Sequence, residues 1–297
     1  MQILIADSNA LRHPGLEQFL AASHDHAVCL SDWTLTEMRK RDALSTSRDS
    51  LKIVFKYPRQ CFALRRTDLL LEDQIGDRDS AEGLIDARAT LGLRQLSQAL
   101  WQIPPHHWLE SEMERLERDA VELIARLRAD VEAWADEMVD AMAVFSRAEV
   151  SLLRSPKTGT IPHETMRKVF DLLLHTTRDF MIRNQQRGGT EPMKVAVAMR
   201  MFGFRYSLCI LLYTLGWVRT GSQSSPSLEK RVNDVIDLQL ATVGTFFNGV
   251  LSRDAKLQEI SQAARHLLRL WGAYVGEDWP PSHPNGNSEQ DNDTPNF

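Results

Sequence analysis

The sequence has few cysteines, few glycines and no long apolar run. Its three cysteines, Cys29, Cys61 and Cys209, are odd in number and far apart in 297 residues. This pattern excludes a disulfide-rich scaffold and predicts reduced, mostly buried thiols. Fifteen glycines and 12 prolines exclude a collagen-like or wholly disordered chain. The most membrane-like stretch, residues 206–218, is too short to cross a bilayer, so we expect a buried helix there.

An excess of charge of one sign is also missing. The chain has 35 basic and 40 acidic residues, a net charge of −5. Five of the acids lie in residues 277–297, which contain no Lys or Arg, so the remainder is balanced at 35 against 35. Nucleic-acid binding would therefore need a local basic patch. The first residues have no basic leader, and Asp7 interrupts their apolar run, so we expect a cytoplasmic protein without a membrane segment.

Short apolar runs alternate with helical patterns at both ends of the chain. Residues 3–6, 26–30 and 61–64 each match a buried strand of a parallel sheet, and residues 250–251 form a very short fourth run. Amphipathic segments separate these runs. The alternation predicts an α/β fold with a parallel sheet.

The middle of the chain, residues 67–228, has almost no strand signal. Helical periodicity extends over residues 81–102, 108–154, 162–186 and 191–218. We therefore expect an all-helical insertion, a bundle of four or more long helices packed on the α/β core. The last segment, residues 273–297, is acidic and rich in Pro and Asn, so we expect it to be disordered.

Four acids lie in similar local contexts near the predicted strands. Asp7 ends the first strand, Glu37 lies in the helix after the second, Asp237 lies in an apolar helix, and Asp254 follows the last strand. Polar groups at the carboxyl ends of parallel strands lie where α/β folds place their sites. A cluster of carboxylates suits Mg²⁺ or Mn²⁺. Such ions activate water and stabilise the charge that develops during phosphodiester cleavage.

These motifs, taken in order, resemble those of the PIN-domain nucleases. That family has a strand ending in Asp-x-Asn, a Ser/Thr-rich lead into a helix bearing Glu, a helix opening with Asp, and a short strand ending in Thr/Ser-x-Asp. The corresponding segments here are ILIADSN, LSDWTLTE and DLQLATVGTFFNGVLSRD. The resemblance implies that the metal-binding and catalytic acids are Asp7, Glu37, Asp237 and Asp254. It also implies supporting roles for Asn9 and Ser252.

Asp234 is the ambiguous acid of this set. It precedes Asp237 by three residues, so both side chains face the same side of a helix. Asp234 is therefore either a fifth acid at the site or a supporting residue behind it.

The resemblance covers residues 1–66 and 229–272 and implies a three-layer core with a parallel sheet, interrupted by the insertion at 67–228. It implies a divalent-metal-dependent nuclease, an endoribonuclease that acts on RNA in preference to DNA. Compact relatives have no such insertion between Glu37 and Asp237, so their substrates and partners do not transfer directly. A toxin, defence or processing role, an antitoxin-like or other protein partner, and a homodimer all stay open.

Each acid also has a purely structural interpretation. Asp7 and Asp254 can cap the helices that follow them. Glu37 can pair with Arg41 one turn later. Asp237 can be a surface acid in the early turns of a helix, where the helix dipole favours it.

A second hypothesis comes from a different class of function. The chain can be a non-catalytic interaction protein, with a degenerate PIN core and a helical docking or self-association surface. Its anchors would be the tryptophans of the helical region, Trp101, Trp108, Trp134 and Trp217.

Overall fold

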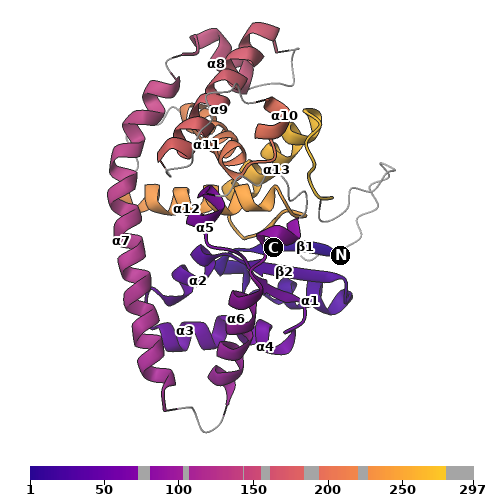
Figure 1. The fold of residues 1–297 in the computed structure, drawn as a ribbon, viewed down its shortest axis with the longest axis vertical. Coiled ribbons are helices and arrows are strands. Elements are labelled where there is room, and N and C mark those ends of the chain that lie inside the picture. Colours follow the sequence, from indigo (N-terminus) through magenta and orange to yellow (C-terminus); the bar gives the residue numbers. More distant parts are fainter. Residues whose placement is uncertain are drawn as a thin grey trace.

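The computed structural model describes residues 1–72, 81–102, 107–142, 144–154, 161–183, 194–219 and 227–278. Four strands form one parallel sheet in the order β3-β2-β1-β4 (Figure 1). Their bounds are β1 (Gln2–Ala6), β2 (His26–Leu30), β3 (Cys61–Ala63) and β4 (Val250–Leu251). The predicted α/β fold with a parallel sheet is confirmed.

The sheet separates two apolar layers, because successive side chains of a strand point to opposite faces. Ile3 and Ile5 of β1 belong to one layer, whereas Leu4 and Ala6 belong to the other. The helices around Leu4 and Ala6 are α1 (Pro14–Ala22), α2 (Asp32–Arg39), α3 (Ala43–Ser50), α4 (Lys52–Lys56) and α6 (Ala87–Trp101). The helices around Ile3 and Ile5 are α5 (Thr67–Glu72), α8 (Arg147–Arg154), α9 (His163–Arg183), α10 (Val195–Ala198), α11 (Phe202–Arg219), α12 (Leu228–Gly244) and α13 (Ala255–Leu270).

The long helix α7 (Leu109–Met142) runs along one side of both layers (Figure 1). Leu109 and Met113 near its start are buried in the layer of Leu4 and Ala6, and Leu127 and Val131 are buried in the layer of Ile3 and Ile5. The described part of residues 67–228 is therefore packed on both faces of the core. Its regular secondary structure is helical, with short turns between the helices and an isolated bridge between Ile85 and Leu64.

Two predicted helices are each divided in the structure. The periodic run 108–154 forms α7 and α8, with the buried Phe145 between them. The run 191–218 forms α10 and α11 in its described part. Apolar periodicity continues across both breaks because the linking residues also pack on the core, so the pattern alone does not reveal where the backbone turns.

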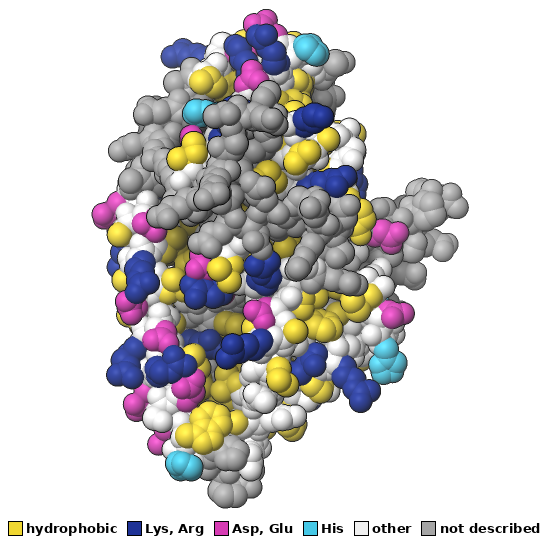
Figure 2. Space-filling view, in the orientation of Figure 1, with side chains coloured by type: hydrophobic (Ala, Val, Ile, Leu, Met, Phe, Trp, Pro, Cys, Tyr) yellow, Lys and Arg dark blue, Asp and Glu magenta, His cyan; other side chains and the backbone are white. Residues whose placement is uncertain are grey.

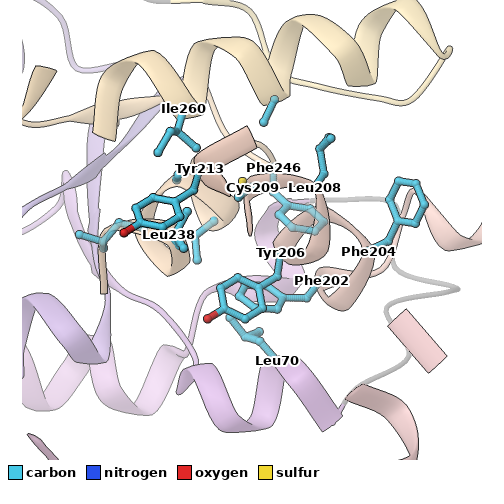
Figure 3. Packing of buried hydrophobic residues seen from close by; sticks show 14 of the residues in the cluster. Leu70, Phe202, Phe204, Tyr206, Leu208, Cys209, Tyr213, Leu238, Phe246 and Ile260 are labelled. Atoms are coloured by element: carbon cyan, nitrogen blue, oxygen red, sulfur yellow. The ribbon is translucent and has the colours of Figure 1, made fainter. Parts of the chain in front are cut away.

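The apolar stretch expected to be a buried helix forms most of α11. Phe202, Phe204, Leu208 and Cys209 are fully buried in the larger apolar cluster (Figure 3). The prediction of a buried helix is confirmed. Across the residues described, none of the helices combines the length and apolar character that crossing a membrane requires. All three cysteines are free and buried, as expected.

Arg265 of α13 ties the C-terminal segment to the core. The residue is 1% exposed and donates hydrogen bonds to the carbonyl oxygens of Gly244 (2.7 Å), Phe247 and Gly276 (2.5 Å), and to Oδ1 of Asp278 (2.8 Å). A Cβ atom at position 276 would lie 2.7 Å from the Phe247 carbonyl oxygen, so only glycine allows this close approach. Residues 273–278 are therefore packed, where the sequence predicted disorder from residue 273. Residues 279–297 lie outside the described residues.

We expect Arg265→Met to lower the free energy of unfolding by about 3 kcal/mol, because buried carbonyl groups lose their donor. Urea denaturation followed by circular dichroism measures the change. The matched control is Arg269→Met, which removes a more exposed arginine that shares two of the Arg265 partners, Asp278 and the Gly276 carbonyl. Its expected cost is about 1 kcal/mol. Equal losses in the two variants would contradict the anchoring role of Arg265.

Candidate active site

Pairing of β1 with β4 brings the two ends of the described chain together. Ala6 lies opposite Leu251 in the parallel register, and the amide of Asp7 donates to the Leu251 carbonyl oxygen at 2.9 Å. Asp7 directly follows β1, Ser252 directly follows β4, and Asp254 lies two residues after Ser252. These three residues therefore meet at the carboxyl edge of the sheet despite their separation in sequence.

The turn before β4 determines this register. Gly249 has a φ of 124°, in the left-handed region that favours glycine. The amide of Ile3 donates to the Asn248 side chain at 2.8 Å, and the Asn248 amide donates to the Ile3 carbonyl at 2.9 Å. A Cβ atom on Gly244 would lie 2.4 Å from Cγ2 of Val250, so glycine allows α12 to approach β4 closely.

Asp7 is buried and held by side chains that the motifs singled out. Its Oδ2 atom accepts hydrogen bonds from Asn9 Nδ2 and from Ser252 Oγ, both at 2.6 Å. Burial raises the pKa of Asp7, although hydrogen bonds from Ser252 and Ser8 oppose this effect. Asp7 precedes the short helix η1 (Ser8–Ala10) but makes no capping hydrogen bond to it. The helix-cap interpretation therefore does not explain this carboxylate.

Glu37 reaches the same edge of the sheet from α2. Thr34 positions this helix, because its hydroxyl donates to the last carbonyl of β1 at 2.8 Å. Glu37 Oε2 accepts a hydrogen bond from Ser8 Oγ at 2.7 Å, and Oε1 lies 3.7 Å from Lys40 Nζ. Within residues 1–72 its ion-pair partner is thus Lys40, not Arg41. The serine next to Asp7 links Glu37 directly to the end of β1.

Asp254 caps helix α13 with one of its two carboxylate oxygens. Its Oδ1 atom accepts hydrogen bonds from the amides of Lys256 (2.8 Å) and Leu257 (3.0 Å), which caps α13. The Asp254 amide donates to Ser252 Oγ at 3.0 Å. The capping interpretation is correct for Oδ1, and the cap fixes the orientation of the whole carboxylate.

Asp237 is the acid whose pKa the neighbouring carboxylates raise. It is half-buried on α12, and its pKa is raised to about 8. Burial is the largest cause, followed by repulsion from the carboxylates of Asp254, Asp7, Glu37 and Asp234. An ordinary surface acid has no such neighbours, so the surface interpretation of Asp237 does not hold.

Asp234 is buried behind Asp237, and both of its oxygens have partners. Oδ2 accepts a hydrogen bond from the Tyr213 hydroxyl at 2.6 Å, and Oδ1 lies 2.7 Å from Lys256 Nζ. This geometry favours a supporting residue over a fifth metal ligand.

The carboxylates approach one another without converging on one point. Among the residues that the structure describes, no group of three or more His, Cys, Asp or Glu side chains is arranged to hold a metal ion. The expected acids are therefore electrostatically coupled, but this arrangement does not itself form a chelating site.

Three residues of the site were missed by sequence reasoning. Ser8 lies between two motif residues, and Lys256 is two positions after Asp254, so proximity in sequence was a usable signal for both. Tyr213 lies within an apolar run and carries no local signal.

No family model, curated protein or solved structure matches the chain. The likeness to PIN-domain nucleases is therefore one of motifs and their order. Any functional conclusion depends on the geometry and charge of the site itself.

We expect the wild type to lose stability as the pH rises, and we expect Asp237→Asn to abolish this loss. Folded Asp237 has a pKa of about 8, above the unfolded value of about 4, so the folded state holds a proton that the unfolded state releases. Stability from this group is therefore present at low pH and declines as the pH rises from about 4 to 8. At pH 8 in EDTA, the free energy of unfolding of the variant should exceed that of the wild type by up to about 5 kcal/mol, because each unit of pKa difference corresponds to about 1.4 kcal/mol.

Urea denaturation at pH 5, 6.5 and 8 measures this difference. The control is Asp130→Asn, which changes an exposed acid on α7. Its free energy of unfolding should change with pH as steeply as that of the wild type. If the free energy of unfolding of Asp237→Asn changed with pH as it does in the wild type, burial and the neighbouring acids would not destabilise the Asp237 carboxylate.

Proposed function

We propose that this chain is a divalent-metal-dependent nuclease that hydrolyses phosphodiester bonds, an endoribonuclease acting on RNA ahead of DNA. The observation that carries this proposal is the crowding of carboxylates around Asp237. Burial of like charges destabilises a fold, and strongly perturbed acids are typical of catalytic and cation-binding sites. The order of the PIN-like motifs supports the same conclusion.

The donor chemistry of the cluster suits Mg²⁺ or Mn²⁺. Carboxylate oxygens are the ligands these ions prefer, and the residues that would hold them are Asp7, Glu37, Asp237 and Asp254. A bound ion of this kind supplies activation of the attacking water and neutralises charge at the scissile phosphate. To hold an ion these side chains must converge further, since no three acids in the described part of the chain form a chelating group.

Supporting residues restrict the freedom of most of these acids. Asn9 and Ser252 hold Asp7, and Ser8 holds Glu37. The cap of α13 holds Asp254. These hydrogen bonds place the carboxylates at one edge of the sheet and limit how far each must move to reach a shared cation.

The helical region borders the site on one side. Helix α7 packs against α2 and α12, which carry Glu37 and Asp237 (Figure 1). Figure 2 shows Lys and Arg side chains gathered beside α7 on the lower half of this face, with Asp and Glu among them. Helix α7 itself carries more acids than bases, and Arg115 and Arg126 are paired with acids of the same helix. The mixed charge on this side therefore gives no net positive patch, and the proposal depends on the acid cluster alone.

We expect the full chain to cleave labelled single-stranded RNA with Mn²⁺ or Mg²⁺ and to lose this activity in EDTA. Asp7→Asn and Asp237→Asn should each reduce the rate at least about 100-fold while the protein stays folded. Mn²⁺ should also raise the melting temperature of the wild type through preferential binding to the folded state. Denaturing gels and differential scanning fluorimetry measure the two effects, with Asp130→Asn as the active control and single-stranded DNA as the alternative substrate.

The competing hypothesis of a non-catalytic docking protein has one observation in its favour. Trp101 and Trp108 are 37% and 38% exposed, unusually high for tryptophan. The side chains of Trp134 and Trp217 lie outside the described residues. A wild-type chain that neither cleaves nucleic acid nor responds to Mn²⁺ would favour docking and leave the acid cluster without a catalytic role.

A further inference from the structure

We propose that Lys256 binds a phosphate group of the nucleic-acid strand at the rim of the acid cluster, and that Asp234 and Tyr213 are its positioning residues. This proposal depends on the proposed function and names the residue through which the site would recognise its substrate backbone.

The ammonium group of Lys256 is fixed from two sides. Its Nζ atom lies 2.7 Å from Asp234 Oδ1 and 4.1 Å from the centroid of the Tyr213 ring. The Tyr213 hydroxyl donates to the other oxygen of Asp234 at 2.6 Å, so all three side chains form one network. The network joins α11, α12 and α13, and its orientation therefore depends on core helix packing.

Lys256 is the accessible member of this network. Asp234 and Tyr213 are buried, whereas the Lys256 side chain is 45% exposed. An ammonium group has three N–H donors, and Asp234 Oδ1 accepts one. The exposed side of the group can therefore donate to a ligand from solvent without breaking the pair with Asp234.

The position of Lys256 places its charge next to the proposed catalytic acids. It lies in the first turn of α13, and its amide donates to Asp254 Oδ1 at 2.8 Å. Its partner Asp234 lies one turn before Asp237 on α12. A lysine in the first turn of a helix is disfavoured by the helix dipole, so helix stability does not explain this residue.

Substrate chemistry gives a reason for a cation at this position. A phosphodiester brings negative charge to a site already rich in carboxylates, and this repulsion must be offset. A lysine acts as a point charge toward a phosphate oxygen. The alternative is that Lys256 only neutralises the buried Asp234. The chain offers a matched pair for comparison, Lys168 with Glu149, whose Nζ and Oε1 atoms are 2.8 Å apart on helices of the other end of the molecule.

The test is binding of a fluorescein-labelled single-stranded RNA to the full chain in EDTA, followed by fluorescence anisotropy at several KCl concentrations. Lys256→Gln should raise Kd about fivefold and reduce the slope of log affinity against log salt by about 0.7, the value for one phosphate contact on a single strand. Lys168→Gln should leave both values unchanged. Lys256→Arg should restore the slope, because it keeps the charge.

The positioning residues have a separate readout. Tyr213→Phe should keep the salt slope, since the Lys256 charge is still present, but raise Kd about twofold. Unchanged Kd and slope in Lys256→Gln, or a wild type that does not bind RNA, would overturn the proposal. This outcome is separable from failure of the proposed function, because metal-dependent cleavage that needs Asp7 and Asp237 could still be observed in the same preparations.

Discussion

The pairing of β1 with β4 is the constraint on which the site depends. Only two residues of β4 take part, Val250 and Leu251, yet they bring Asp7 together with Ser252 and Asp254. The entropic cost of closing a loop grows only slowly with its length, so a long helical region between the two strands does not prevent this pairing. Packing of that region on both faces of the sheet then stabilises the pairing.

Sequence reasoning succeeded where one local pattern has one structural meaning. A buried parallel strand is an uninterrupted apolar run, so residues 26–30 and even the two-residue β4 were predictable, and with them the polar groups at the strand ends. The Asp234–Lys256–Tyr213 network was not predictable, because it depends on how α11, α12 and α13 pack in space. The packing of residues 273–278 was also hidden, since Arg265 binds backbone carbonyl groups that every sequence offers.

Asp254 shows that a structural and a functional interpretation of one residue need not exclude each other. From the sequence alone, the helix cap and the metal ligand are alternatives. In the structure Oδ1 caps α13, and the charge of the same carboxylate still acts on Asp237. Asp7 differs, because its Oδ2 atom accepts hydrogen bonds from the side chains of Asn9 and Ser252, and its carboxylate makes no capping hydrogen bond to η1.

The cost of the acid cluster supports the proposed enzyme over the docking protein. A docking protein needs an exposed apolar surface and gains nothing from several carboxylates that raise the pKa of Asp237 to about 8. Most natural sequences avoid such local conflicts except at functional sites. Here specific contacts maintain the repulsion between the acids, because Ser252 and Asn9 bind Asp7 and keep it from turning to solvent. A buried, oriented carboxylate beside other acids is an arrangement that a cation stabilises and that a purely structural surface would relax, and this favours the nuclease.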